Sequence, residues 1–221
     1  MWFRDLRWWV LDYCYALFWQ ARGIISRTRP ETFLGGSKSP IVVIPGVYET
    51  WRFLQPLIEH VNSTGHPVHV LDFARFNSGP VAITANQVIE HLERNDLRDV
   101  TIVAHSKGGL VGKYVMTTAI GRARVSGMLA VAAPFSGSRY ARFLVVPSLR
   151  MFSPRDQTIL ALSQQNDVNT RIVSVYGSFD PHIPGGSSAP GAKNVELDAG
   201  GHFRVLAHPR VFAELGALLH R

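Results

Sequence analysis

Residues 100–109 read VTIVAHSKGG, and this stretch decides the fold. Its apolar start favours a buried strand, and the glycines after Ser106 favour a sharp turn into a helix. A serine at such a turn needs small neighbours, here Ala104 and Gly108, because its backbone is strained and closely packed. We therefore expect Ser106 at the carboxyl edge of a sheet, with the next N–H at a helix start. A serine that only caps the helix is the alternative.

Strands and helices alternate along the chain from residue 41 onward. Continuous apolar strands separated by helices are typical of a parallel sheet that is covered on both faces. The pattern predicts an α/β fold with about six mostly parallel strands. The predicted strands are 41–45, 67–73, 100–104, 125–132, 172–176 and 195–197, and the predicted helices are 51–62, 81–93, 107–120, 157–165 and 211–219.

The composition of the 221 residues fits a globular protein, with 46% hydrophobic and 18% charged residues. The single cysteine, Cys14, can form neither an internal disulfide nor a cysteine-based metal site. The net charge of +7 suggests an anionic partner, but the basic residues are scattered, which disfavours nucleic acid. The glycine motifs that bind nucleotides are absent from the sequence.

The N-terminal part, residues 1–37, differs from the rest of the chain and is predicted to be an aromatic amphipathic helix with a linker. It holds four of the five tryptophans. The apolar stretch 8–19 contains Asp12 and is shorter than the roughly 20 residues that a membrane-spanning helix needs. A cleavable signal peptide is disfavoured because a small-residue cleavage site is lacking. Residues 38–221 are predicted to form the catalytic domain.

Two roles stay open for the helix within residues 1–29. Tryptophan and tyrosine favour the boundary between membrane and water, and flanking arginines would face anionic head groups, so we favour an interfacial helix. Packing on the protein's own core, or on a second copy in a homo-oligomer, is the alternative. We expect a cytoplasmic or peripheral membrane protein.

A serine hydroxyl needs a base before it can act as a nucleophile, and a histidine held by a carboxylate supplies one. Where a serine stands at a strand-to-helix turn, the chain order is serine, acid, histidine. His202 lies in a glycine-rich turn after the last predicted strand and fits the base. Asp180 follows the fifth predicted strand and fits the acid, with Asp198 as the second candidate.

A pair of backbone N–H groups is expected to stabilise the oxyanion that forms on a substrate carbonyl. One belongs to Lys107, directly after the nucleophile. The other belongs to Val47, in the turn after the first predicted strand, where Gly46 allows the backbone to curve closely. By placement alone, Tyr48, Trp51 and Phe135 are candidates for binding the acyl part of a substrate. Residues 134–154 carry arginines among apolar residues and could touch a lipid surface.

From about residue 40 to 212, the chain resembles the α/β-hydrolase superfamily, and more narrowly the small bacterial triacylglycerol lipases that lack a large lid. The most specific pieces are VTIVAHSKGG at 100–109, IVSVYGSFD at 172–180 and GAKNVELDAGGHF at 191–203. The resemblance implies a minimal α/β-hydrolase fold, a triad of Ser106, Asp180 and His202, and no cofactor or metal. The chain departs from these lipases at Lys107, where they usually have Met, and at Pro45, where they usually have His.

The sequence therefore predicts a serine hydrolase that cleaves carboxylic esters, of lipid or acyl type, through an acyl-enzyme intermediate. Two alternatives stay open. An acyltransferase would use the same triad to pass the acyl group to an alcohol, and a catalytically silent protein would only bind a membrane surface. Neither the natural substrate, nor the acyl chain length, nor the direction of the Lys107 side chain follows from the sequence.

Overall fold

A six-stranded, all-parallel sheet forms the centre of the molecule, in the strand order β2-β1-β3-β4-β5-β6. The computed structural model describes residues 2–71, 77–143 and 145–220. The strands are β1 (Ile41–Ile44), β2 (Val68–Val70), β3 (Val100–His105), β4 (Val125–Val131), β5 (Ile172–Phe179) and β6 (Lys193–Gly200). The predicted α/β class and the parallel sheet are thus confirmed.

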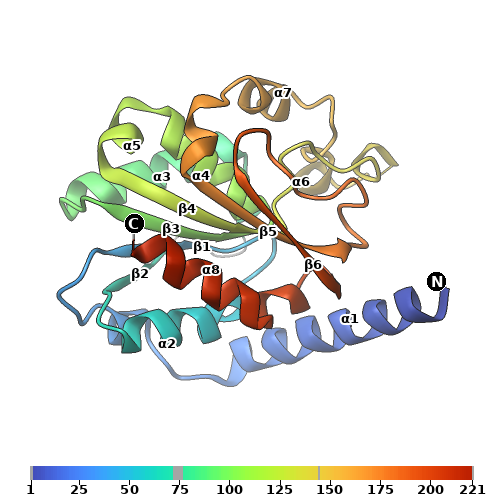
Figure 1. Ribbon diagram of the computed structural model, residues 1–221, viewed down its shortest axis with the longest axis horizontal. Coiled ribbons are helices and arrows are strands. Elements are labelled where there is room, and N and C mark those ends of the chain that lie inside the picture. Colours follow the sequence, from blue (N-terminus) through green and yellow to red (C-terminus); the bar gives the residue numbers. More distant parts are fainter. Residues whose placement is uncertain (1, 72–76, 144, 221) are drawn as a thin grey trace.

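Helices cover both faces of the sheet, as Figure 1 shows. Helices α3, α4 and α5 lie on one face, and α2 and α8 lie on the other, with α1 beside them. The helices are α1 (Trp2–Ile25), α2 (Gln55–Ser63), α3 (Val81–Arg94), α4 (Lys107–Thr117), α5 (Ala119–Arg124), α6 (Pro147–Arg150), α7 (Gln157–Ser163) and α8 (Pro209–Leu219).

The two-sided cover follows from the alternation of side chains along each strand. In β1, Val42 and Ile44 enter the core under α3 and α4, whereas Ile41 and Val43 enter the core under α2 and α8. All four residues are buried, so the strand reads as a continuous apolar run. Two apolar cores, one on each face, therefore hold the sheet and fix its carboxyl edge.

The predicted helix 107–120 is in fact two helices, α4 and α5. Thr118 leaves the helical conformation, and its hydroxyl oxygen accepts a hydrogen bond from the N–H of Gly121. A side chain at Gly121 would lie 1.9 Å from the carbonyl oxygen of Val115, so only glycine allows this close turn. Because of this break, α4, which directly follows Ser106, is a short helix of 11 residues.

Two segments at the edges of the prediction also differ. The predicted linker holds a short 3₁₀ helix, Pro30–Phe33, whose Phe33 is buried. Strand β2 ends at Val70, and residues 72 and 73 of the predicted strand lie outside the described residues.

Helix α1 lies along the domain on the side of β6, as Figure 1 shows. It also contacts the segment Trp51–Leu54 before α2 and the short helix Arg204–Ala207 after β6. Among the described residues, none of the helices combines the length and the apolarity that crossing a bilayer requires.

Candidate active site

Ser106 lies at the turn between β3 and α4, with a backbone conformation that is rare for any residue but glycine (φ 50°, ψ −121°). The turn needs glycine at both positions 108 and 109, at the start of α4. A side chain at Gly108 would lie 2.2 Å from the carbonyl oxygen of Ile44, and one at Gly109 would lie 2.4 Å from Cβ of Ala133. The sequence therefore places the hydroxyl at the carboxyl edge of the sheet because glycines let α4 start against the neighbouring strands.

Three distant side chains meet at this edge. The Ser106 hydroxyl lies 2.9 Å from Nε2 of His202, and Nδ1 of the same ring lies 2.8 Å from a carboxylate oxygen of Asp180. The other Asp180 oxygen accepts the backbone N–H groups of His182 and Ile183, at 2.7 and 2.9 Å. Asp198, the second candidate for the acid, is exposed on β6. The arrangement is a hydroxyl, an imidazole and a carboxylate in one hydrogen-bonded row.

The charges and hydrogen bonds within this row lower the pKa of Asp180 and raise the pKa of His202. Burial alone would raise the pKa of Asp180, but the charge of His202 and the hydrogen bonds from His202, Ile183 and His182 lower it to about 2. Burial alone would lower the pKa of His202, but the charge and hydrogen bond of Asp180 outweigh it and raise the pKa. The carboxylate is therefore ionised at neutral pH and stabilises a proton on His202.

A second buried hydrogen-bond network joins the loop after β1, the end of β3 and the loop after β6. The Glu49 carboxylate accepts the backbone N–H of Gly46 at 2.8 Å and lies 2.8 Å from Nδ1 of His105. The other ring nitrogen of His105 lies 2.9 Å from the carbonyl oxygen of His202. Both Glu49 and His105 are buried. The network connects the loop after β1, the residue before Ser106 and the backbone of His202 to one another.

The Lys107 side chain turns away from the Ser106 hydroxyl. Its ammonium donates to the backbone oxygen of Asn77 at 2.5 Å, to the side-chain oxygen of Asn77 at 3.0 Å and to the carbonyl of Gly79. Burial lowers the pKa of Lys107 to about 8. The direction that the sequence left open is thus toward the segment before α3, and only the backbone N–H of Lys107 stays beside the hydroxyl.

The loop after β1 lies next to the nucleophile. Val47 lines the same cavity as Ser106, and Gly46 is held by Glu49. Tyr48 stands in a left-handed conformation (φ 60°) and its hydroxyl bonds to the Ser148 hydroxyl on α6. The loop begins at Pro45, and the Glu49 carboxylate steadies it by accepting the Gly46 N–H.

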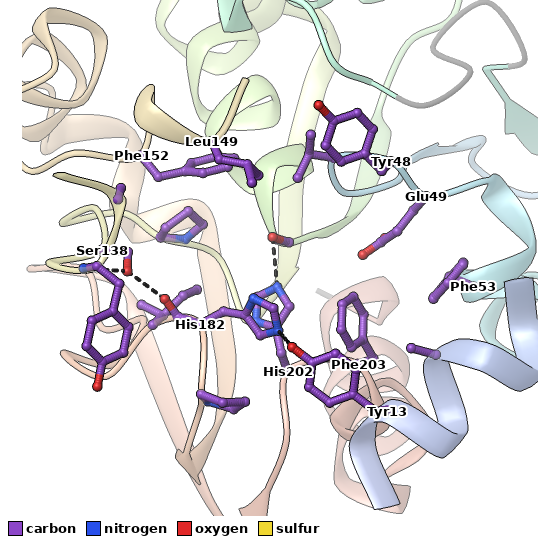
Figure 2. A pocket seen from close by; sticks show the side chains of 18 of the residues that line it. Tyr13, Tyr48, Glu49, Phe53, Ser138, Leu149, Phe152, His182, His202 and Phe203 are labelled. Atoms are coloured by element: carbon purple, nitrogen blue, oxygen red, sulfur yellow. Dashed lines mark hydrogen bonds between the residues drawn. The ribbon is translucent and has the colours of Figure 1, made fainter. Parts of the chain in front are cut away.

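A cavity of about 540 Å³ opens onto the Ser106 hydroxyl, and Figure 2 shows its lining. Most of its wall is apolar, which suits a hydrocarbon chain better than a charged group. The apolar lining residues come from α1, from the loops after β1 and β4, and from the segment after β5. They are Ala16, Leu17, Val47, Phe53, Pro134, Ala141, Leu149, Phe152, Pro181 and Ile183, and Phe203 after β6 adds to them.

Of the three residues expected to bind the acyl part, the structure places one in the cavity lining and two in the core. Tyr48 lines the cavity. Trp51 does not: it is buried against Phe33 in the core under α2. Phe135 lies in the core on the other face, beside the Lys113 ammonium. The placement of these two is corrected because their rings fill the interior behind the cavity, where packing takes large aromatic side chains.

Helix α1 contributes residues to the cavity that the sequence did not single out. The Tyr13 hydroxyl lies 3.2 Å from Nε2 of His182, and the Gln20 amide donates to the carbonyl of Tyr48 at 3.4 Å. The His182 ring stacks near His202, and burial lowers its pKa to about 3, so it is uncharged at neutral pH. The one sign in the sequence that this helix contacts the domain was Asp12 inside an apolar stripe, because a charge buried on such a face requires partners.

The described residues hold no cluster of three or more histidine, cysteine, aspartate or glutamate side chains that could bind a metal ion.

No family model matches the sequence, and no curated protein matches it. Solved structures do match. Lipase B of Aspergillus fumigatus has a TM-score of 0.70 at 16% identity, over 86% of this chain and 54% of that one. The Bacillus licheniformis lipase BlEst2 in its mature form has a TM-score of 0.60 at 16% identity, over 82% and 92%. A bromoperoxidase from Bacillus anthracis has a TM-score of 0.60 at 15% identity, over 84% and 93%. At these identities the likeness concerns the fold.

Proposed function

The chain has the α/β-hydrolase fold, and on that premise we propose that it is a serine hydrolase that cleaves carboxylic esters. The observation that carries the proposal is the row in which the Ser106 hydroxyl lies 2.9 Å from Nε2 of His202 and Nδ1 of that ring lies 2.8 Å from Asp180. This row opens into an apolar cavity rather than into the core. Such a geometry is what acyl transfer through a serine requires.

In the proposed reaction, the Ser106 oxygen attacks the ester carbonyl while its proton passes to Nε2 of His202. The ionised Asp180 stabilises the imidazolium that forms. The tetrahedral intermediate collapses when His202 gives this proton to the leaving alcohol, which departs and leaves an acyl-enzyme. Water then attacks the acyl carbon, loses its proton to His202, and the carboxylic acid leaves as the Ser106 hydroxyl is restored. His202 is neutral again after acylation and after deacylation, and the net reaction is the hydrolysis of one ester bond.

The oxyanion of each tetrahedral intermediate is proposed to accept hydrogen bonds from the backbone N–H groups of Val47 and Lys107. Two observations support this assignment. Val47 lines the cavity beside Ser106, and Lys107 begins α4, where N–H groups lack helical partners. Loss of one such donor costs about 3 kcal/mol of transition-state stabilisation.

The substrate proposed is an ester with an apolar acyl chain, of lipid or fatty-acyl type. The apolar lining of the cavity supports it, since Leu149, Phe152 and Ile183 present hydrocarbon to whatever the cavity holds. The Tyr13 hydroxyl and the uncharged His182 are the polar groups at one side. They are suited to the ester or alcohol end of such a molecule rather than to an anionic one.

A lipid surface is the proposed location of this substrate. The outer face of α1 exposes Leu6, Val10 and Phe18, and the arginines Arg4, Arg7 and Arg22 on the same helix are exposed with them. An apolar helix face with basic residues fits the boundary of a bilayer that contains anionic lipid. Phe143 and Val145, in the segment after β4, are exposed as well.

The experiment for the catalytic proposal compares wild type with Ser106→Ala on p-nitrophenyl butyrate and with a fluorophosphonate probe. We expect the probe to label Ser106 and the substitution to abolish turnover, by several orders of magnitude, with thermal unfolding unchanged. Wild-type protein that neither hydrolyses esters nor takes up the probe would remove the proposal. Added acceptor alcohol, with analysis of products, separates ester hydrolysis from acyl transfer to an alcohol.

The surface proposal is tested by co-sedimentation with vesicles of phosphatidylcholine and phosphatidylglycerol. The double variant Val10→Gln, Phe18→Gln changes only the exposed face, and we expect weaker vesicle binding with unchanged turnover of p-nitrophenyl butyrate. Vesicle binding that the double variant does not weaken would refute the surface proposal, and a smaller oligomer in the variant than in wild type would show that a second copy of the chain covers this face.

A further inference from the structure

The Asp12 carboxylate, on the inner face of α1, is completely buried against the loop that carries His202. One of its oxygens accepts the backbone N–H of His202 at 2.8 Å. The other accepts the backbone N–H groups of Phe203 and Arg204, both at 2.8 Å. Three consecutive N–H groups thus converge on one carboxylate, an arrangement that favours a negative charge.

The loop is shaped to receive this carboxylate. A side chain at Gly200 would lie 2.3 Å from the Trp8 ring, and one at Gly201 would lie 2.5 Å from the Asp12 carboxylate. Gly201 also adopts a positive φ of 119°, which other residues rarely do. Only glycines at these two positions let α1 approach the backbone of β6 closely enough for the contact.

The residue that carries the base is therefore held at three points. Asp12 holds the His202 N–H, the His105 ring lies 2.9 Å from the His202 carbonyl oxygen, and Asp180 orients the His202 ring. The contact of Asp180 sets the tilt of the ring, but it does not set where the Cα of His202 lies. Without the Asp12 carboxylate, the loop would have one buried and two partly buried N–H groups to satisfy in another way.

Resting on the proposed function, we infer that Asp12 is a positioning residue for that reaction: from the N-terminal helix, it holds the His202 backbone at the place from which the imidazole reaches the Ser106 hydroxyl. It touches neither substrate nor reacting atoms. Its effect on turnover passes through the position of His202.

The charge of Asp12 adds a second, separable effect. The groups that face His202 are the carboxylates of Asp180, Glu49 and Asp12, the rings of His105 and His182, and the Ser106 hydroxyl. The three carboxylates raise the pKa of His202, with Asp180 first among them. Loss of the Asp12 charge therefore lowers the pKa of His202 and moves the acid limb of the pH–rate profile to lower pH.

The experiment compares wild type, Asp12→Asn and Asp5→Asn as full chains. Asparagine keeps the size of the side chain but replaces one accepting oxygen with an NH₂ group, which faces an N–H. The matched control, Asp5→Asn, makes the same change of charge on the same helix, where Asp5 contacts only Arg4 at 3.7 Å among the described residues. We measure kcat and KM for p-nitrophenyl butyrate, the pH–rate profile and thermal unfolding.

For Asp12→Asn, we expect kcat to fall by about tenfold or more, because displacements below 1 Å at a reacting group have effects of this size. KM should stay within about twofold, since the cavity wall is unchanged, and the acid limb should move to lower pH. Asp5→Asn should match wild type in all three measurements. A lower unfolding temperature with unchanged kcat and pH profile would show that Asp12 only stabilises the fold, and would overturn the inference.

Amide hydrogen exchange on the wild type keeps the inference testable if Asp12→Asn fails to fold. The peptide that spans residues 201–204 should exchange slowly, and free exchange of these amides would overturn the inference directly. The two proposals also fail in different ways. A wild type without esterase activity or fluorophosphonate labelling refutes the proposed function, whereas an active wild type whose Asp12→Asn variant keeps its kcat refutes the role of Asp12 alone.

Discussion

The substitution Gly108→Ala tests how closely α4 must approach β1 for turnover. The added methyl carbon would lie 2.2 Å from the carbonyl oxygen of Ile44 and 3.0 Å from that of Pro45. Both are backbone atoms, so no side chain can rotate away. The methyl must move by about 0.8 Å to reach even the 3.0 Å below which such contacts essentially do not occur.

This displacement separates the two proposed oxyanion donors, because Ile44 leads into the loop of Val47 and Gly108 follows Lys107. A misplacement of about 1 Å at a reacting group costs about a hundredfold in rate. That corresponds to about 2.7 kcal/mol of activation free energy. We therefore expect kcat for p-nitrophenyl butyrate to fall by about a hundredfold in Gly108→Ala, with a parallel fall in the rate of fluorophosphonate labelling.

Gly112→Ala is the matched control on the same helix. Its added methyl meets Sδ of Met128 at 2.5 Å, the end of a flexible side chain that can move aside. We expect kcat within about threefold of wild type. A Gly108→Ala protein that is folded and keeps its wild-type kcat would refute the reasoning, because α4 could then move away from β1 without consequence for the oxyanion.

Three further predictions concern charge. Glu49→Gln replaces the buried carboxylate that accepts the Gly46 N–H and lies 2.8 Å from Nδ1 of His105 with an uncharged amide; we expect a loss of about 3 kcal/mol in the free energy of unfolding, measured in urea, and a stability equal to wild type would contradict the network. The pH–rate profile of the wild type should have its acid limb above pH 6.5, because the proposed mechanism needs neutral His202 and Asp180 raises the pKa of that ring; an acid limb below pH 6.5 would count against the pair. Lys107 has a pKa near 8 in the fold and near 10.5 when unfolded, so the unfolded chain binds the extra proton between these values and the folded state gains stability as pH rises through this window. Unfolding in urea at pH 7.5 and pH 9.5 should show a smaller gain in Lys107→Met than in wild type, and an identical gain would mean that the ammonium is not buried.

The parallel sheet and the place of Ser106 at a strand-to-helix turn could be predicted because both depend on local patterns. Continuous apolar strands mark a parallel sheet, and the glycines around Ser106 are needed within a few residues of it. The histidine and the acid followed from chain order and from the carboxyl ends of strands. Helix ends were less predictable. The break at Thr118 depends on the contact between Gly121 and Val115, which no periodicity contains.

The parts of the site that sequence reasoning missed are contacts between distant residues. Asp12 meets His202 across 190 positions, and Glu49 meets His105 across 56. The apolar stripe around Asp12 is a local sign of burial, but nothing local identifies the distant residue that a buried carboxylate contacts. The same holds for Trp51 and Phe135: each stands near a motif in the sequence, but packing turned their rings into the core.

The contact between Asp12 and the His202 loop joins a segment that is made earlier in synthesis to one that is made later. Helix α1 is synthesised before the three amides that its carboxylate binds, which follow about 190 residues later. A nascent chain released before residue 202 contains Ser106 but lacks His202, and it leaves the carboxylate of α1 without these amides. Loop closure over such a separation is among the last steps of folding. Under the proposed function, chains that lack this loop are expected to be inactive toward esters, because α1 can dock on the loop only after residues 202–204 have been made.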